Sequence, residues 1–316
     1  MNRRIIIRVV IFLVVIIVAL VLLSGLFIPK FYLEDEWATT STFREFYEDK
    51  DKDDVIFIGS SRGASAFDPI QLESETGLKG YNICCEQQNL STSYYWLKEA
   101  LRSQSPKTVV LDTNYLYLNR ENDSNLFSEG CVRKAIDNMH WSIPKIEIVR
   151  YICSVDDEQS IIDYVFPILR FHDRWQELSK KDIVYSPSGR KGYNPIDYNK
   201  TADQEYHTYV ADQSSESLTM DDEMEEYLNR IKKLCDDNNI KLLLVSCVSN
   251  EENANRYLGT NRWCQNNDVR FVDFNLDDTY KAVGYNFYAD NSSGNHAGIT
   301  GAKKMTSYIG NILLNM

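Results

Sequence analysis

Residues 54–69 read DVIFIGSSRGASAFDP, and this stretch indicates both a fold and a site. The four apolar residues Val55–Ile58 are followed at once by Gly59-Ser60-Ser61-Arg62-Gly63. A short apolar run that ends in a turn is typical of a strand buried on both faces of a parallel sheet. Polar groups that follow such a strand lie at the sheet edge where open α/β folds bind ligands. Ser61 is therefore a candidate nucleophile, with a simple polar turn as the alternative.

The same strand pattern recurs along the chain. Further apolar runs occur at 80–83 (GYNI), 108–112 (TVVLD), 241–246 (KLLLVS) and 269–274 (VRFVDF), and helical segments with one apolar face lie between them. Strands that alternate with helices form right-handed crossovers and a parallel sheet covered on both faces. The predicted fold class is α/β, a flavodoxin-like three-layer sandwich with about five parallel strands.

The alternation stops between residues 115 and 219. This stretch contains Pro144 at an expected helix start, an apolar and aromatic segment at 161–175 with helical spacing, and the loop SPSGRKGYNPIDYNK at 186–200. We expect an insertion of helices and one long loop over one end of the sheet. Loops of that length are more often functional than incidental.

The N-terminal region predicts a membrane helix. Residues 9–28 carry no charge and follow Arg3, Arg4 and Arg8, and 20 residues of helix span about 30 Å, the thickness of a hydrocarbon layer. A cleaved signal peptide is the alternative, although its apolar region is ordinarily shorter. By the positive-inside rule, residues 1–8 are cytoplasmic. The expected protein is single-pass in the cell membrane, with a linker and short helix at 29–50 and an extracellular domain at 51–316.

Charge and cysteine content exclude several classes of partner. The net charge is −12, and because residues 1–28 hold three arginines and no acid, the remainder carries −15. This argues against nucleic acid or anionic lipid as the main partner, since phosphates require Lys and Arg. The seven cysteines lack CxxC spacing, and no P-loop or HExxH motif occurs. We expect no cofactor and no metal.

A serine nucleophile needs a base and donors for the oxyanion that forms. His296 is the natural base, because the other three histidines lie in the insertion. Asp290 is the nearest upstream carboxylate and would fix the imidazole tautomer. The backbone N–H of Ser61 and the side-chain amide of Asn114, which follows the third strand, are candidate oxyanion donors. The parts of an acyl-transfer site are thus present.

Four segments together resemble the SGNH/GDSL hydrolase superfamily: GSSRGASAFDP at 59–69, YNICCEQQNLSTSYYWLKEAL at 81–101, Asn114, and FYADNSSGNHAGITGAKKMTSYI at 287–309. More narrowly, the chain resembles membrane-anchored bacterial members related to the D-alanyl transfer protein of teichoic acid synthesis and to alginate O-acetylation proteins. The resemblance covers roughly 55–112 and 241–314. It implies that Ser61 is the nucleophile, that His296 is the base, and that Gln87 stands where the family has an oxyanion glycine.

The last segment departs from the family pattern Asp-x-x-His. Ser293 stands three residues before His296, and Asp290 stands six before it. A different alignment would pair Asp290 with Ser293 and leave a serine in the base position. The spacing in HAGITGAKK favours His296. Residues 59–63 also fit the G-x-S-x-G elbow of α/β-hydrolases, but roughly 25 residues after the membrane helix are too few for the strands that precede that elbow.

Two functions follow from these expectations. The first is an exported, membrane-tethered serine esterase or O-acyltransferase acting on acyl esters of a cell-envelope or secreted polysaccharide. The alternative is a non-catalytic accessory protein that docks to a membrane-bound acyltransferase or binds glycan. A lipid-cleaving esterase is a third, weaker possibility.

Overall fold

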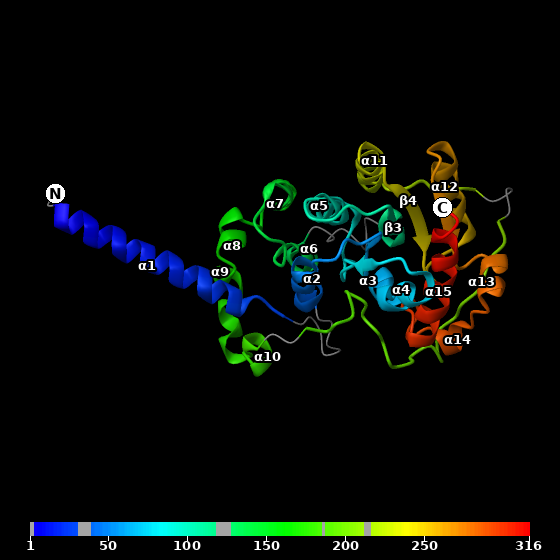
Figure 1. Ribbon diagram of the computed structural model, residues 1–316, viewed down its shortest axis with the longest axis horizontal. Helices are drawn as coiled ribbons and strands as arrows, with labels where there is room; N and C mark the ends of the chain where they lie inside the picture. Colours follow the sequence, from blue (N-terminus) through cyan, green and yellow to red (C-terminus); the bar gives the residue numbers. More distant parts are fainter. Residues whose placement is uncertain (1–2, 31–38, 118–127, 185–186, 212–215) are drawn as a thin grey trace.

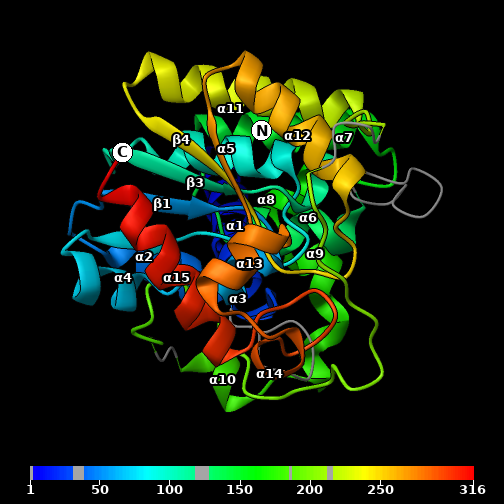
Figure 2. The same cartoon turned by 90° about the vertical axis from the view of Figure 1, so that its right-hand side faces the viewer.

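The computed structural model describes residues 3–30, 39–117, 128–184, 187–211 and 216–316. Within them, one five-stranded sheet consists of β1 (Val55–Ile58), β2 (Gly80–Asn82), β3 (Thr108–Asp112), β4 (Lys241–Ser246) and β5 (Arg270–Asp273). All its pairings are parallel, in the order β2-β1-β3-β4-β5. Figure 2 shows β1, β3 and β4 side by side in this sheet. The prediction of an α/β fold with five parallel strands is confirmed. This is the flavodoxin-like strand order, in which ligands bind where β1 and β3 separate.

Alternate residues of each strand supply two separate cores. In β1, Ile56 and Ile58 belong to one buried cluster, whereas Val55 and Phe57 belong to the other. The alternation arises because successive side chains of a strand point to opposite faces. Both faces are apolar, so helices must cover both, as the uninterrupted apolar runs predict.

Helices cover the two faces as separate layers (Figures 1 and 2). One layer contains α2 (Thr39–Glu48), α5 (Leu90–Ala100), α6 (Glu129–Ile136), α7 (Ile143–Val155), α11 (Asp222–Asp237) and α12 (Ala254–Asn266). The other contains α3 (Ser61–Ala66), α4 (Pro69–Thr76), α13 (Asp277–Val283), α14 (Phe287–Asp290) and α15 (Ile299–Leu313). In the first layer, the fully buried Trp96 stacks on Phe43 with ring centroids 4.1 Å apart. The short helix expected within 29–50 is therefore part of the core.

The N-terminal helix α1 (Arg3–Phe27) projects away from the body of the protein (Figure 1). Among the described residues it is the one helix long and apolar enough to cross a membrane. Its apolar side chains are exposed along most of its length. Such a helix is either a membrane anchor or part of a secretion signal.

The insertion contains short helices in place of the single helical segment expected at 161–175. They are α8 (Ile161–Val165), α9 (Ile168–Phe171), the 3₁₀ helix η2 (His172–Gln176) and α10 (Lys180–Ile183); a further 3₁₀ turn, η1 (Asn114–Leu116), precedes the insertion. The segment is helical over most of its length, as expected, but Pro167 interrupts it. Phe166, directly before it, leaves the helical region with φ −125° and ψ 75°. A residue before proline is sterically disfavoured in the α region.

The long loop at 187–200 lies across the carboxyl edge of the sheet. The Lys191 carbonyl accepts the N–H of Asn82 at 2.9 Å, and the Asn194 N–H donates to Ala64 O at 2.9 Å. Between them, Gly192 has φ +84°, and a Cβ there would lie 1.8 Å from the carbonyl oxygen of Asn82. The loop is therefore fixed against β2 and α3, beside the segment that carries Ser61.

Candidate active site

Ser61 is the first residue of α3 and follows β1 after a two-residue turn. The turn needs Gly59, whose φ is +143° and whose Cβ, if present, would lie 2.6 Å from the Cβ of Asp112. Ser60 caps the helix, because its Oγ accepts the N–H of Arg62 at 3.2 Å. Ser61 itself is only partly buried. The tight turn thus presents Ser61 at the carboxyl edge of the sheet.

Asp112, the last residue of β3, fixes this turn. Its carboxylate accepts the backbone N–H of Ser60 at 3.1 Å and the N–H of Asn114 at 3.2 Å, and it also accepts the Ser60 hydroxyl. The Asn114 amide donates to Ser60 Oγ at 3.1 Å. The structure therefore places Asn114, a predicted site residue, beside the turn that carries Ser61. Sequence reasoning did not single out Asp112, although an acid that ends an apolar strand was a visible signal.

His296 lies against Ser61, although 235 positions separate the two residues in the chain. The distance from His296 Nε2 to Ser61 Oγ is 2.8 Å. The imidazole is carried by a small loop before α15, which is closed by hydrogen bonds from Ser292 N–H to His296 O (2.9 Å) and from Gly298 N–H to Asp290 O (2.8 Å). The structure thus brings together the serine and the histidine that the sequence selected.

Burial keeps the imidazole of His296 neutral. Desolvation, together with the positive charge of Arg62, lowers its pKa from 6.5 to about 4, and Glu251 opposes the change. Removing a group from water disfavours its charged form, and a nearby like charge acts in the same direction. At neutral pH, Nε2 can therefore accept the Ser61 hydroxyl proton. The low pKa also makes the imidazole a weak base.

Asp290 lies elsewhere than expected. Its buried carboxylate accepts the backbone N–H of Asn286 at 2.7 Å and the ammonium of Lys304 at 2.6 Å. Ser293 takes the place beside the imidazole, with its Oγ 3.3 Å from His296 Nδ1. The structure therefore brings Asp290 to the ends of α14 and α15, not to the ring. The physical reason is that a helix start and a lysine offer the carboxylate two charge-assisted partners.

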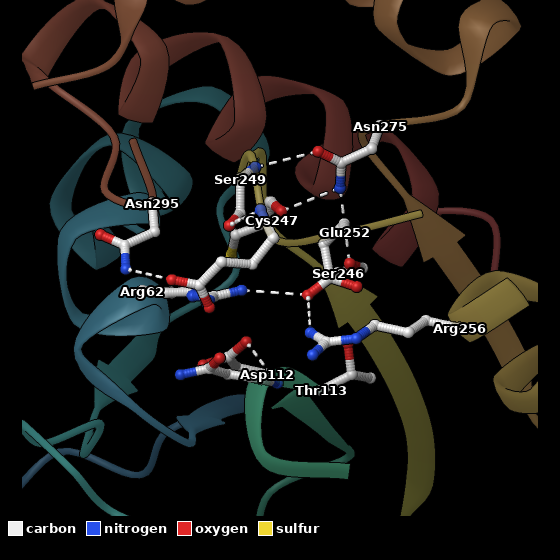
Figure 3. Close-up of polar contacts among 12 residues, drawn as sticks. Arg62, Asp112, Thr113, Ser246, Cys247, Ser249, Glu252, Arg256, Asn275 and Asn295 are labelled. Carbon is white, nitrogen blue, oxygen red and sulfur yellow. Dashed lines mark hydrogen bonds and ion pairs between the residues drawn. The ribbon is translucent and has the colours of Figure 1, made fainter. Parts of the chain in front are cut away.

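A network of ion pairs around Arg62 lies beside Ser61 and His296, and Figure 3 shows its polar contacts. The guanidinium of Arg62 is 3% exposed and pairs with Glu251 and, at 3.0 Å, with Glu252. Glu251 also accepts the amide of Asn295 at 3.0 Å. Glu251 thus connects Arg62, the residue after Ser61, to Asn295, the residue before His296.

Gln87 stands at the position of the expected oxyanion glycine, and its backbone has a conformation that favours glycine. Its φ is +56°, in the left-handed region. The same loop is held next to the Ser61 turn by the hydrogen bond from Cys85 N–H to Gly59 O, at 3.0 Å. The conformation expected for the glycine is therefore present, with a side chain added to it.

We expect Gln87→Gly to raise the free energy of unfolding by about 1 kcal/mol. A non-glycine residue in the left-handed conformation costs roughly 1–2 kcal/mol, which Gln87→Gly removes. Part of this stabilisation is offset, because glycine is more flexible in the unfolded chain. Denaturant titration of the full-length protein measures the change. Gln87→Ala keeps the left-handed strain and should show no gain. Equal stabilities for the two variants would contradict the expectation.

Two solved structures are similar to this chain. A putative acylhydrolase from Bacteroides fragilis has 13% sequence identity and a TM-score of 0.40, covering 86% of this chain and 93% of its own. A GDSL-like lipase from Bacteroides thetaiotaomicron has 11% identity and a TM-score of 0.38, covering 87% of this chain and 98% of its own. No family model and no curated protein matches the sequence. At such low identity and TM-score, we draw no functional conclusion from these likenesses.

The described residues show no group of three or more His, Cys, Asp or Glu side chains arranged to hold a metal ion. The chemistry visible at this edge is that of a hydroxyl, a neutral imidazole and amide donors. This set can transfer a proton from Ser61 and hydrogen-bond an oxyanion.

The acid limb of serine reactivity should report the pKa of His296. With wild-type protein, the labelling rate of Ser61 by a fluorophosphonate is expected to stay constant down to about pH 5 and to fall as the pH passes through about 4, because the neutral imidazole is the active form. Ser293→Asp puts a carboxylate at Nδ1, which raises a neighbouring pKa by roughly 1–3 units. In Ser293→Asp, the fall in the labelling rate should occur at higher pH, and the constant rate above it should be larger than in the wild type.

Ser293→Asn is the matched control, because it has the shape of aspartate without the charge. Its labelling rate should fall at about the same pH as that of the wild type. Identical limbs for the Asp and Asn variants would show that Nδ1 does not face residue 293 in solution.

Proposed function

We propose that this protein is a membrane-tethered serine esterase or O-acyltransferase in which Ser61 is the nucleophile and His296 the base. The observation that carries the proposal is the 2.8 Å contact between Ser61 Oγ and Nε2 of an imidazole kept neutral by burial. This is the pairing that turns a weak hydroxyl nucleophile into an active one. It is supported by its place at the sheet edge where β1 and β3 separate.

The proposed reaction has two steps. Ser61 Oγ attacks the carbonyl carbon of an acyl ester and gives its proton to His296 Nε2; the ester bond then breaks, and the leaving alcohol takes that proton. An acyl-enzyme remains, which water or a sugar hydroxyl attacks while His296 again accepts the proton. The bond between the acyl carbon and Ser61 Oγ then breaks, and His296 returns the proton to Oγ, which releases the acid or the acylated sugar. The N–H of Ser61, the amide of Asn114 and the N–H of Gln87 are the proposed oxyanion donors.

For the substrate, we propose an acylated cell-envelope or secreted polysaccharide outside the cell. The apolar helix α1 is consistent with a domain held at a membrane surface. Near the His296 loop, Tyr198 and Tyr288 are exposed, and Lys200 N–H donates to Ser292 O. Exposed aromatic rings combine an apolar face with a polar end and suit sugar rings.

A non-catalytic role is the second candidate, and one observation favours it. Ser293 stands beside His296 where a carboxylate would strengthen the base, and the pKa of His296 is lowered to about 4. In this version, the domain docks to a membrane-bound acyltransferase or holds glycan. Ser61→Ala would then leave the cellular function of the protein intact, whereas it would abolish that function if the protein acts as an enzyme.

The deciding experiment treats the full-length protein in detergent with a fluorophosphonate probe and locates the adduct by intact and peptide mass. We expect one adduct, on Ser61, that Ser61→Ala removes. Ser65→Ala is the matched control, because Ser65 lies in the same helix and its hydroxyl donates to the backbone carbonyl of Arg62. It should label normally. Folded wild-type protein without an adduct on Ser61 would overturn the enzymatic proposal in favour of the accessory role.

A further inference from the structure

The short helices of the insertion expose an unusual amount of apolar surface. We call residues 161–184, which comprise α8, α9, η2 and α10, the collar. Seven large apolar side chains of the collar are between 39% and 72% exposed: Ile161, Ile162, Val165, Leu169, Trp175, Ile183 and Val184. Contiguous apolar patches on a protein surface mark interaction sites.

The collar is attached to the end of α1. The N–H of Ile168 donates to Ser24 Oγ at 3.2 Å, and the Arg174 guanidinium donates to the carbonyl of Phe27 at 2.6 Å. Ser24 is only 4% exposed, in contrast to the exposed residues before it in α1. Figure 1 shows α8, α9 and α10 gathered around this end of α1, between it and the rest of the domain. The collar therefore has a fixed position along the axis of α1.

The length of α1 sets the depth of the collar. A 25-residue helix is about 37 Å long, which exceeds a hydrocarbon layer of about 30 Å. When the charge-free residues 9–28 span the hydrocarbon layer, the last turn of α1, with Ser24 and Phe27, lies at the outer boundary between acyl chains and headgroups. Because the collar is bonded to this turn, it lies at the same level.

We propose that the collar is a membrane-contact surface, with its apolar side chains inserted at the boundary between headgroups and acyl chains of the outer leaflet. The collar is hydrogen-bonded to the end of the membrane helix, and Trp175 is a residue type enriched at this depth. Short amphipathic helices bind such interfaces through buried apolar area. The domain is then held against the bilayer by two elements, α1 and the collar.

The contact is apolar and does not depend on anionic lipid. The four basic residues of the collar are balanced by four acidic residues, and its arginines are paired within the protein, Arg170 with Glu129 and Arg174 with Asp182 at 2.9 Å. The chain after residue 28 carries a net charge of −15, which would repel an anionic surface. We therefore expect the contact with neutral lipid to be insensitive to salt.

Trp175 provides the test. Full-length protein is reconstituted in vesicles of neutral phosphatidylcholine whose acyl chains carry bromine either near the headgroup or near the bilayer centre, and tryptophan emission is recorded. The difference in tryptophan emission between the wild type and Trp175→Phe is the contribution of Trp175. We expect bromine near the headgroup to quench at least half of that contribution, and bromine at the centre to quench much less, at both low and high salt.

Trp141 is the matched control, because it is 50% exposed, compared with 65% for Trp175, and lies outside the collar. The contribution removed by Trp141→Phe should be little quenched. Equal quenching of the two contributions, or none for Trp175, would overturn the proposal.

A second measurement covers other occupants of the patch. A photo-crosslinking amino acid at Ile183, activated in native membranes, should give adducts of lipid mass. A dominant adduct of protein mass would show that a membrane protein covers the collar and would overturn the assignment to lipid. Neither measurement depends on whether Ser61 is reactive, so failure here leaves the proposed chemistry untouched.

Discussion

His296→Ala is expected to slow fluorophosphonate labelling of Ser61 by about 10²–10⁴-fold, the usual contribution of a positioned base. The variant removes the group 2.8 Å from Ser61 Oγ and leaves Asp112, which fixes the turn, in place. The serine should remain in position without an acceptor for its proton. The second-order rate constant of labelling, measured on full-length protein in one detergent, gives the factor.

Two controls separate the loss of the base from a loss of structure. His172→Ala removes a 65% exposed imidazole in the insertion and should label at the wild-type rate. Added imidazole should restore part of the rate of His296→Ala, because the vacated space is next to Ser61, and should restore nothing to Ser61→Ala. A His296→Ala protein that labels as fast as the wild type would mean that another group activates Ser61.

Arg62→Met is expected to lower stability by about 3–5 kcal/mol, which is the usual cost of breaking a buried ion pair by removing one partner. Glu252, which is 8% exposed, would lose its ion pair with Arg62 and keep the one with Arg256, 3.4 Å away. For a chain of this size, the melting temperature should fall by about 10 °C. The acid limb of Ser61 labelling should also move to higher pH, because the Arg62 charge helps to lower the pKa of His296.

The partners of Arg62 allow a sharper comparison. Glu251→Gln, at a 51% exposed side chain, should cost less than about 1 kcal/mol. The double variant Arg62→Met with Glu252→Gln should be more stable than Arg62→Met alone, because no buried charge is left unpaired. A double variant with the summed cost of both changes would show that the two side chains do not interact.

The strands β1 and β3 could be predicted because each is a short, mostly apolar run with buried side chains on both faces, and the others follow the same spacing between helices. Val55–Ile58 and Thr108–Asp112 are buried throughout, so the local pattern and the tertiary position agree. The helical segment expected at 161–175 is divided into short helices for a local reason, because Pro167 interrupts it although its apolar residues have helical spacing. That outcome was available from the sequence.

The candidate site was predictable only in part, for physical reasons. Ser61 and His296 stand next to strand and helix boundaries, and boundaries can be placed from a sequence. Asp290 was chosen by distance along the chain, but a side chain binds the partners it faces, which here are Asn286 and Lys304. The pairing of Arg62 with Glu251 and Glu252 joins segments about 190 residues apart, and no local pattern encodes it.

Gly192 offers a marker for recognising other chains built in the same way. Because a Cβ at this position would meet the carbonyl of Asn82 at 1.8 Å, and φ is +84°, any protein that lays this loop across its second strand must keep glycine there. Gly59 is required by the same kind of close approach, to Asp112. We therefore expect other chains that place the loop in this way to keep both glycines, the first of them two residues before a serine.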